Sequence, residues 1–94
     1  MKKLLVKDIL KVTGGKLVIG DCEEVLENFS KDTRQIKEND TYVAIKGANF
    51  DGNKFWKQAL EKGAKAVIVQ DIDFSKEDLT KYKNKIIIKT KDVL

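Results

Sequence analysis

Thr41–Val69, TYVAIKGANFDGNKFWKQALEKGAKAVIV, is the stretch that decides the fold of this chain. It opens with Thr41–Lys46, whose residues favour a strand, and it closes with the uninterrupted apolar run Ala66–Val69. Between these strands, the apolar residues of Asn53–Lys62 recur at helical spacing, and Gly63 follows as a helix terminator. Strand, helix and strand within about thirty residues predict a βαβ unit with parallel strands.

The helix of this unit has one apolar face. Its members are Phe55, Trp56, Ala59 and Leu60. We expect Trp56 to lie in the core, because it shares this face with Leu60. Asp51 or Asn53 can cap the start of the helix, since both side chains accept hydrogen bonds from backbone N–H groups.

The N-terminal residues predict a further helix and strand. The apolar residues of Val6–Thr13 share one face at helical spacing. Gly14-Gly15 then ends this helix, because glycine adopts the left-handed conformation of a C-terminal cap without strain. Lys16–Ile19 is a brief apolar strand, which the turn at Gly20 closes.

The segment that follows is less regular. Cys22–Phe29 alternates only in part and predicts extended structure, with Cys22 as a small buried hydrophobic residue. Ser30–Asp40 is interpreted as mostly loop, in which Ile36 is the residue to bury and Asn39 takes a left-handed turn conformation.

Two elements complete the chain after the βαβ unit. The charged segment Ser75–Tyr82 is weakly helical, and Lys85–Lys89 supplies a last buried strand. The elements together predict a single α/β domain over residues 1–94. In it, helices pack on a small mixed sheet that contains the βαβ unit.

The composition is that of one soluble folded domain. Of the 94 residues, 41% are hydrophobic and 36% are charged, and no run approaches the ~18 apolar residues of a membrane span. A single cysteine fits a reducing cytoplasm. The formal net charge of +4 comes from lysines spread along the chain, which form a solvated surface or attract an anionic ligand. The lack of aromatic-rich basic motifs disfavours nucleic acid.

Catalytic groups are missing from the sequence. There is no histidine, which removes the commonest general base and zinc ligand. There is also no G-x-x-x-x-G-K-[ST] phosphate loop to hold ATP. We therefore expect these residues on their own to have no catalytic activity, no metal site and no cofactor.

A candidate binding loop, Lys46–Asn53 (KGANFDGN), follows the first strand of the βαβ unit. Ligands of α/β sheets gather beyond the carboxyl ends of parallel strands, where this loop lies. The N–H groups of Ala48 and Asn49 can meet a base edge or a phosphate. Phe50 can stack on a base, and Gly47 allows a close approach to the backbone. The alternative is a tight turn between strand and helix whose glycines serve only the geometry.

A second polar cluster, Ser30–Arg34, contains the only arginine of the chain. It is either an anion or ribose site, or a local ion pair of its aspartate and arginine that pins a loop. At the helix N-terminus, the carboxylate of Asp51 would repel a phosphate. An anion is therefore expected at Lys31, Arg34 or Lys46.

Taken in order, several of these segments resemble the N-terminal domain of the Mur ligases. The family pattern is roughly D-[ST]-R-x-[IV]-x-x-G-D-x-[FY]-[VI]-A-[LI]-x-G-x-x-x-D-G, followed by a helix and G-A-x-A-[VI]. The matching residues are Asp32–Arg34, Ile36, Lys37, Asp40, Tyr42–Gly47, Asn49–Gly52, Phe55, Ala59, Gly63, Ala64 and Ala66–Val69. Each motif alone is unspecific, and it is their common order and spacing that carry the resemblance.

The resemblance implies a function and a set of binding residues. In this family the N-terminal domain holds the UDP part of a UDP-N-acetylmuramoyl-peptide, a precursor of peptidoglycan in the cytoplasm. A central domain binds ATP and Mg²⁺, and a C-terminal domain brings the incoming amino acid or dipeptide. By their places in the motif, the implied UDP-binding residues are Lys31, Thr33, Arg34, Lys46, Gly47, Ala48, Asn49 and Phe50.

Within the family, the Asn49–Gly52 motif resembles most the ligase that adds D-Ala-D-Ala to the UDP-N-acetylmuramoyl tripeptide. The alternatives are the ligase that adds the third amino acid and a stand-alone module that binds nucleotides or a protein without catalysis. The central and C-terminal domains are expected outside residues 1–94. The sequence departs from the family pattern at Glu38 and Asn39, where Pro-Gly is usual, and at Asn53, where histidine is common.

Overall fold

The computed structural model describes residues 3–46, 51–70 and 72–90. The strands are β1 (Lys3–Leu5), β2 (Lys16–Ile19), β3 (Val25–Glu27), β4 (Phe29–Ser30), β5 (Thr41–Val43), β6 (Ala66–Gln70) and β7 (Ile86–Thr90). The helices are α1 (Val6–Thr13) and α2 (Trp56–Glu61), with short 3-10 turns η1 (Thr33–Gln35), η2 (Gly52–Phe55), η3 (Phe74–Lys76) and η4 (Thr80–Tyr82). Within these ranges, none of the helices has the length and apolar character that a membrane span requires.

The main sheet has five strands in the order β2-β7-β6-β5-β4. The four strands from β4 to β7 are parallel, and β2 pairs antiparallel with β7. β5 and β6 are adjacent and in register, with Thr41 opposite Ala66 and Val43 opposite Ile68. The predicted βαβ unit and the predicted mixed sheet are therefore both confirmed.

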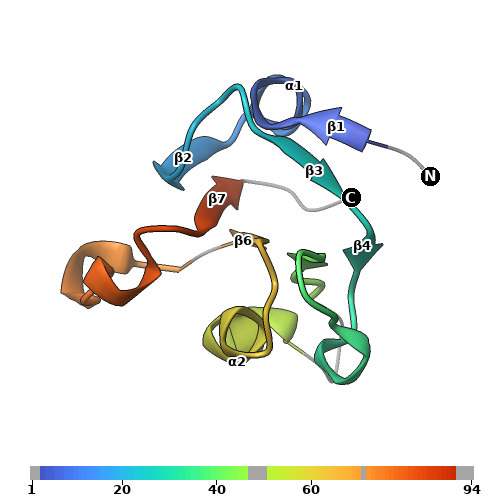
Figure 1. Cartoon of the computed structure of the whole chain (residues 1–94). Helices are drawn as coiled ribbons and strands as arrows, with labels where there is room; N and C mark the ends of the chain where they lie inside the picture. Colours follow the sequence, from blue (N-terminus) through green and yellow to red (C-terminus); the bar gives the residue numbers. More distant parts are fainter. Residues whose placement is uncertain (1–2, 47–50, 71, 91–94) are drawn as a thin grey trace.

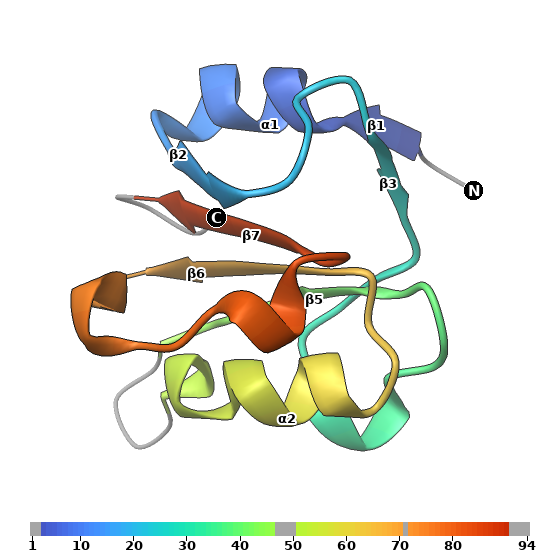
Figure 2. The same ribbon diagram turned by 60° about the vertical axis from the view of Figure 1, so that its left-hand side comes forward.

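The fold has three layers, with the sheet in the middle (Figures 1 and 2). On one face, Val6 and Ile9 of α1 pack with Ile68 and Ile88 of the sheet. The antiparallel pair of β1 and β3 lies on the same side as α1. The other face is covered by α2 and the 3-10 turns that follow β6 (Figure 2).

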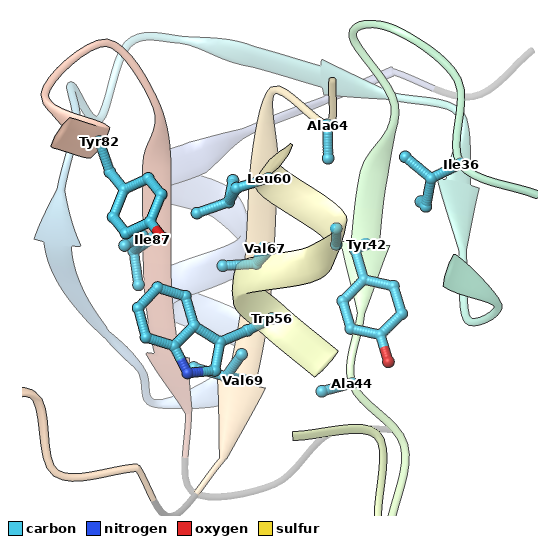
Figure 3. Close-up of a cluster of buried hydrophobic side chains, with 11 residues drawn as sticks. Ile36, Tyr42, Ala44, Trp56, Leu60, Ala64, Val67, Val69, Tyr82 and Ile87 are labelled. Carbon is cyan, nitrogen blue, oxygen red and sulfur yellow. The ribbon is translucent and has the colours of Figure 1, made fainter. Parts of the chain in front are cut away.

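The core on the α2 side is built around Trp56 (Figure 3). Its ring meets Phe74 and Tyr82 edge-on, with centroid distances of 5.2 and 5.5 Å. Only 5% of Trp56 is exposed, which confirms the predicted core position. Edge-to-face aromatic pairs of this kind add about 1 kcal/mol each beyond the burial of apolar area.

The predicted helix caps and turn residues are confirmed. Gly14 ends α1 with φ +67°, and its N–H donates to the carbonyl of Leu10. Asn39 has φ +71°, the left-handed conformation expected of it. Asp51 rather than Asn53 caps the 3-10 turn η2 that precedes α2, since its side chain accepts from the N–H of Asn53, whereas α2 itself begins after Phe55 without a side-chain cap.

The prediction of a buried Cys22 is wrong. Its side chain is exposed because it stands in the turn that joins β2 to β3, where the N–H of Glu24 donates to the carbonyl of Asp21. The extended segment Cys22–Phe29 is correct only in part. Asn28 has φ +58°, so the chain breaks there: β3 pairs with β1, and β4 joins the main sheet.

Other element boundaries also differ from the prediction. The strand from Thr41 ends at Val43, although the N–H of Ala44 still donates to the carbonyl of Ile68. The first turn of the predicted helix Asn53–Lys62 is a 3-10 turn. Ser75–Tyr82 forms no α-helix, because extended backbone at Glu77 separates η3 from η4. The strand β1 was not predicted.

Candidate functional site

A surface pocket of about 480 Å³ lies beyond the carboxyl ends of β4 and β5. It is lined by Lys31, Asp32, Thr33, Arg34, Ile45, Phe55 and Gln58. Three of the predicted binding residues, Lys31, Thr33 and Arg34, are thus brought together there. Lys46 follows the lining residue Ile45 in the chain, whereas Gly47, Ala48, Asn49 and Phe50 lie outside the described residues.

Asp32 and Arg34 form one wall of the pocket as an ion pair. The Asp32 carboxylate accepts from Arg34 Nε at 3.1 Å and from Arg34 Nη2 at 2.9 Å, and it also accepts from the Arg34 N–H at 2.9 Å. The side-chain hydrogen bond from Arg34 holds the pKa of Asp32 below its ordinary value, and the same bond raises the pKa of Arg34.

The ion pair leaves much of the arginine available. A guanidinium has five N–H donors, of which the two side-chain bonds to Asp32 use two. The Arg34 side chain is 84% exposed. The two predicted alternatives for this cluster, a local ion pair and an anion site, are therefore compatible in geometry.

The turn that carries these residues is fixed to its surroundings. Ser30 Oγ accepts from the N–H of Asp32 at 3.2 Å. Lys62, which follows the last residue of α2, donates from Nζ to the carbonyl of Thr33 at 3.0 Å. The polar wall is thus held at both ends, by the end of β4 and by the end of α2.

The opposite wall contains Ile45, which follows β5 in the chain, and Phe55 of η2. Lys46 and Asp51 form an antiparallel β-bridge, and the N–H of Gly52 donates to the carbonyl of Ile45 at 2.7 Å. The buried hydroxyl of Tyr42 donates to the carbonyl of Gly52 at 2.9 Å. These contacts fix both ends of the predicted binding loop to β5.

Gly52 has no room for a side chain. A Cβ at this position would lie 2.8 Å from Ile45 N, 2.9 Å from Ile45 O and 2.9 Å from the Tyr42 hydroxyl. The glycine after Asp51 in the motif is therefore required by close packing of the backbone on β5. Its φ is not positive, so a left-handed conformation is not the reason.

The carboxylates of Asp32 and Asp51 both influence the buried hydroxyl of Tyr42. Burial raises the pKa of the Tyr42 hydroxyl, and the charges of Asp32 and Asp51 raise it further. Asp32 belongs to the polar wall and Asp51 to the loop after β5. Asp32 and Asp51, which come from the two separate stretches of sequence, therefore both lie near Tyr42.

Sequence reasoning missed Ile45, Phe55 and Gln58 as lining residues. Phe55 was assigned to the core face of the helix, and it does pack against the core while also lining the pocket. Gln58 stands three residues after Phe55, a spacing that places the two side chains on one side of the chain. This spacing, combined with the position of the helix at the carboxyl edge, was the available signal.

Neither a cluster of metal ligands nor a phosphate loop is found in the part of the chain that the structure describes. Within 3–46, 51–70 and 72–90, no group of three or more His, Cys, Asp or Glu side chains could hold a metal ion. The sequence also lacks the phosphate loop that would cradle a triphosphate.

The family model described as "Mur ligase family, catalytic domain" matches residues 25–94. Similar curated proteins include the UDP-N-acetylmuramoyl-L-alanyl-D-glutamate--2,6-diaminopimelate ligases of Clostridium tetani and Clostridium perfringens. The first is 43% identical over 86 residues, which cover 92% of this chain and 17% of the relative. The second is 35% identical over 89 residues, which cover 95% of this chain and 17% of the relative. The chain thus spans about a sixth of these proteins.

Solved structures show the same fold. A crystal structure of MurF from Acinetobacter baumannii matches with a TM-score of 0.74 at 17% identity, over 99% of this chain and 19% of that chain. A structure of the UDP-N-acetylmuramoylalanyl-D-glutamyl-2,6-diaminopimelate--D-alanyl-D-alanyl ligase from the same organism matches with a TM-score of 0.73 at 16% identity. It covers 98% of this chain and 19% of that chain.

Proposed function

Because the chain belongs to the Mur ligase family, we propose that it binds the UDP part of a UDP-N-acetylmuramoyl-peptide. It would do so as the N-terminal domain of an ATP-dependent ligase of peptidoglycan synthesis in the cytoplasm. The observation that carries this proposal is the pocket beyond β4 and β5, in which Lys31, Thr33 and Arg34 meet Ile45 and Gln58.

The pocket offers separate groups for the separate parts of UDP. Ile45 and Phe55 provide apolar surface against which a flat base can pack. The amide of Gln58 can both donate and accept, as the edge of a uracil ring requires. Lys31 and Arg34 carry the positive charge that a diphosphate needs.

The remaining predicted contacts complete the same site. Lys46 lies at the end of the loop stem, on the same edge of the sheet. By their place in the motif, Gly47–Phe50 would add backbone N–H groups and an aromatic face to the binding of the nucleotide. The chain would hold the nucleotide while other domains of the parent carry out the ligation.

The relatives favour the ligase that adds the third amino acid. The 2,6-diaminopimelate ligase of Clostridium tetani is 43% identical over 92% of this chain. The D-Ala-D-Ala-adding ligase, to which the Asn49–Gly52 motif is similar, is the second candidate. Its structural matches at 16–17% identity support the fold alone. ATP, Mg²⁺ and the central and C-terminal domains belong to the proposed parent.

An NMR titration tests the proposed function. UDP and a UDP-N-acetylmuramoyl-peptide are added to the ¹⁵N-labelled chain, with ADP and inorganic pyrophosphate as matched controls. Shifts at 31–34 and 46–51 that are stronger with UDP than with ADP would support recognition of the base. Equal shifts with pyrophosphate would reduce the site to general anion attraction. No shifts at millimolar UDP would refute the proposal for this chain.

A further inference from the structure

Lys62 connects the two walls of the pocket. Gln58 lines the pocket from α2, and Lys62 follows one helical turn later, with its N–H donating to the carbonyl of Gln58 at 3.0 Å. Residues at this spacing lie on the same face of a helix, so the Lys62 side chain leaves the end of α2 on the side of Gln58. From there its Nζ donates to the carbonyl of Thr33 at 3.0 Å. Thr33 lines the pocket from the polar wall, in η1.

This hydrogen bond differs from those that give the turn η1 its shape. The Asp32 carboxylate accepts from the N–H of Arg34 at 2.9 Å, and the Thr33 carbonyl accepts from the N–H of Ile36 at 3.4 Å. Both bonds join near neighbours in sequence, so they fix the turn but not its distance from α2. The bond from Lys62 spans 29 residues of the chain and does fix that distance.

The charge of Lys62 also acts at the polar wall. It helps to lower the pKa of Asp32, behind the larger effects of the hydrogen bonds from Arg34. The ammonium group is thus close enough to the ion pair to influence its carboxylate. Lys62 is not one of the residues that line the pocket. Its effect on a ligand must therefore pass through the residues of the wall that it holds.

We infer that Lys62 is a positioning residue for nucleotide binding: through its hydrogen bond to Thr33, it sets the spacing between Gln58 and the polar wall. This inference rests on the proposed function, in which one ligand meets both the amide of Gln58 and the guanidinium of Arg34. UDP carries its base and its diphosphate at two ends of one molecule, so the separation of these two groups must fit it. Without the bond, the wall must be ordered when the ligand binds, which costs affinity.

The test uses Lys62→Met, Lys62→Arg and Lys57→Met. Lys62→Met keeps an apolar stem and removes the donor and the charge, whereas Lys62→Arg keeps both. Lys57→Met is the matched control, because it removes the same charge from the same helix, together with a 2.7 Å ion pair to Glu77. Lys57 does not line the pocket. The Kd values for UDP and for inorganic pyrophosphate are measured by calorimetry on the whole chain, and ¹⁵N order parameters of 33–36 are measured without ligand.

Lys62→Met is expected to lower the order parameters and to weaken UDP binding by about 5-fold, the size of one lost hydrogen bond. Pyrophosphate needs only the charged wall, so its Kd should rise by less than about 2-fold. Lys62→Arg should behave like the unaltered chain, and Lys57→Met should change neither Kd.

Three results would overturn the inference. Unchanged UDP affinity in Lys62→Met would mean that Lys62 serves the fold alone. An equal loss for UDP and pyrophosphate, or an equal loss in Lys57→Met, would mean that charge and not spacing is responsible. Failure of the unaltered chain to bind UDP would instead refute the proposed function, and unchanged order parameters in Lys62→Met would even then show that Lys62 does not hold the wall.

Discussion

Two hollows on this small domain differ in chemistry. The pocket beyond β4 and β5 is lined by charged, hydroxyl and amide side chains together with Ile45 and Phe55. Hydrogen bonds from Tyr42 of β5 and from Lys62, after the end of α2, hold its surroundings in place. The groove beside α1, of about 220 Å³, is mainly apolar. It is lined by Leu4, Asp8, Ile9, Val12, Thr13, Phe29, Val43 and Ile68.

The two hollows differ in how strongly their contacts with a ligand depend on geometry. Hydrogen bonds and ion pairs depend on angle and distance, so a pocket built from them selects a ligand by the placement of its polar atoms. Apolar contact is proportional to area and carries no such information. The first hollow is therefore suited to a small polar molecule, and its framework should be more sensitive to substitution than the groove.

The largest expected effect is on the framework, in Gly52→Ala. An added Cβ would lie within 3 Å of both Ile45 N and Ile45 O, so the stem must separate from β5. We expect a loss of about 2–3 kcal/mol in the free energy of unfolding, measured by chemical denaturation. Gly14→Ala is the matched control. Its Cβ meets nothing within 4 Å, so only its left-handed φ costs energy, about 1 kcal/mol. Equal losses in the two variants would contradict the steric argument.

The next effect is on binding, in Arg34→Ala. This change removes a guanidinium and leaves the Asp32 carboxylate facing the anionic ligand without its partner. We expect roughly a 10-fold weaker Kd for UDP, measured by calorimetry. Val12→Lys adds a charge in the groove beside α1 and should leave the Kd unchanged. Tighter binding in Val12→Lys would mean that the overall charge, and not the pocket, attracts the ligand.

A smaller effect distinguishes two buried tyrosines. Tyr42 donates to the carbonyl of Gly52, whereas the Tyr82 hydroxyl has no hydrogen-bond partner among the described residues. Tyr42→Phe should cost about 1 kcal/mol in unfolding free energy, and Tyr82→Phe should be neutral or stabilise by up to about 1 kcal/mol. Thermal unfolding of both variants measures this. A destabilised Tyr82→Phe would show that its hydroxyl has a partner.

The smallest effect is the response to acid. The pKa values of Asp32 and Asp51 lie below the ordinary 3.8, first because of hydrogen bonds from Arg34 and from the N–H of Asn53. A depressed carboxylate pKa stabilises the fold above pH 3.8, and this contribution is lost as the pH falls through the native pKa. Carboxyl ¹³C shifts followed by NMR should show both low values. Arg34→Ala should raise the pKa of Asp32 and leave that of Asp51 nearly unchanged.

The sequence predicted the parts of the fold that follow from local pattern. α1 and β2 were placed to the residue, because a helical stripe, a glycine cap and a short apolar run are all local signals. β1 was missed, since three residues acquire strand structure only through their pairing with β3. The exposure of Cys22 was missed for a related reason, because a turn and not the residue type decides it.

The residues of the candidate site were also predicted only in part. Lys31, Thr33 and Arg34 were predicted from their places in the motif; the structure shows that they line one pocket, and their contact with a ligand stays a prediction. Gln58 was missed, because on a helix surface it looks like any polar residue. The hydrogen bond from the N–H of Gln70 to Asn53 was also not predicted, since the two residues are seventeen apart along the chain. Contacts between residues so far apart in the sequence can be identified only once the arrangement of the strands is known.

The short strand β2 has a consequence for association. It lies outside the segment 25–94 that matches the family, yet it is the strand that pairs with β7. Without it, the apolar strand Ile86–Ile88 would present an open row of N–H and C=O groups to other chains. β2 is itself a poor template, because it is short, begins with Lys16 and is irregular between Leu17 and Ile19. β2 therefore covers an edge of the sheet that would otherwise be open to pairing with another chain.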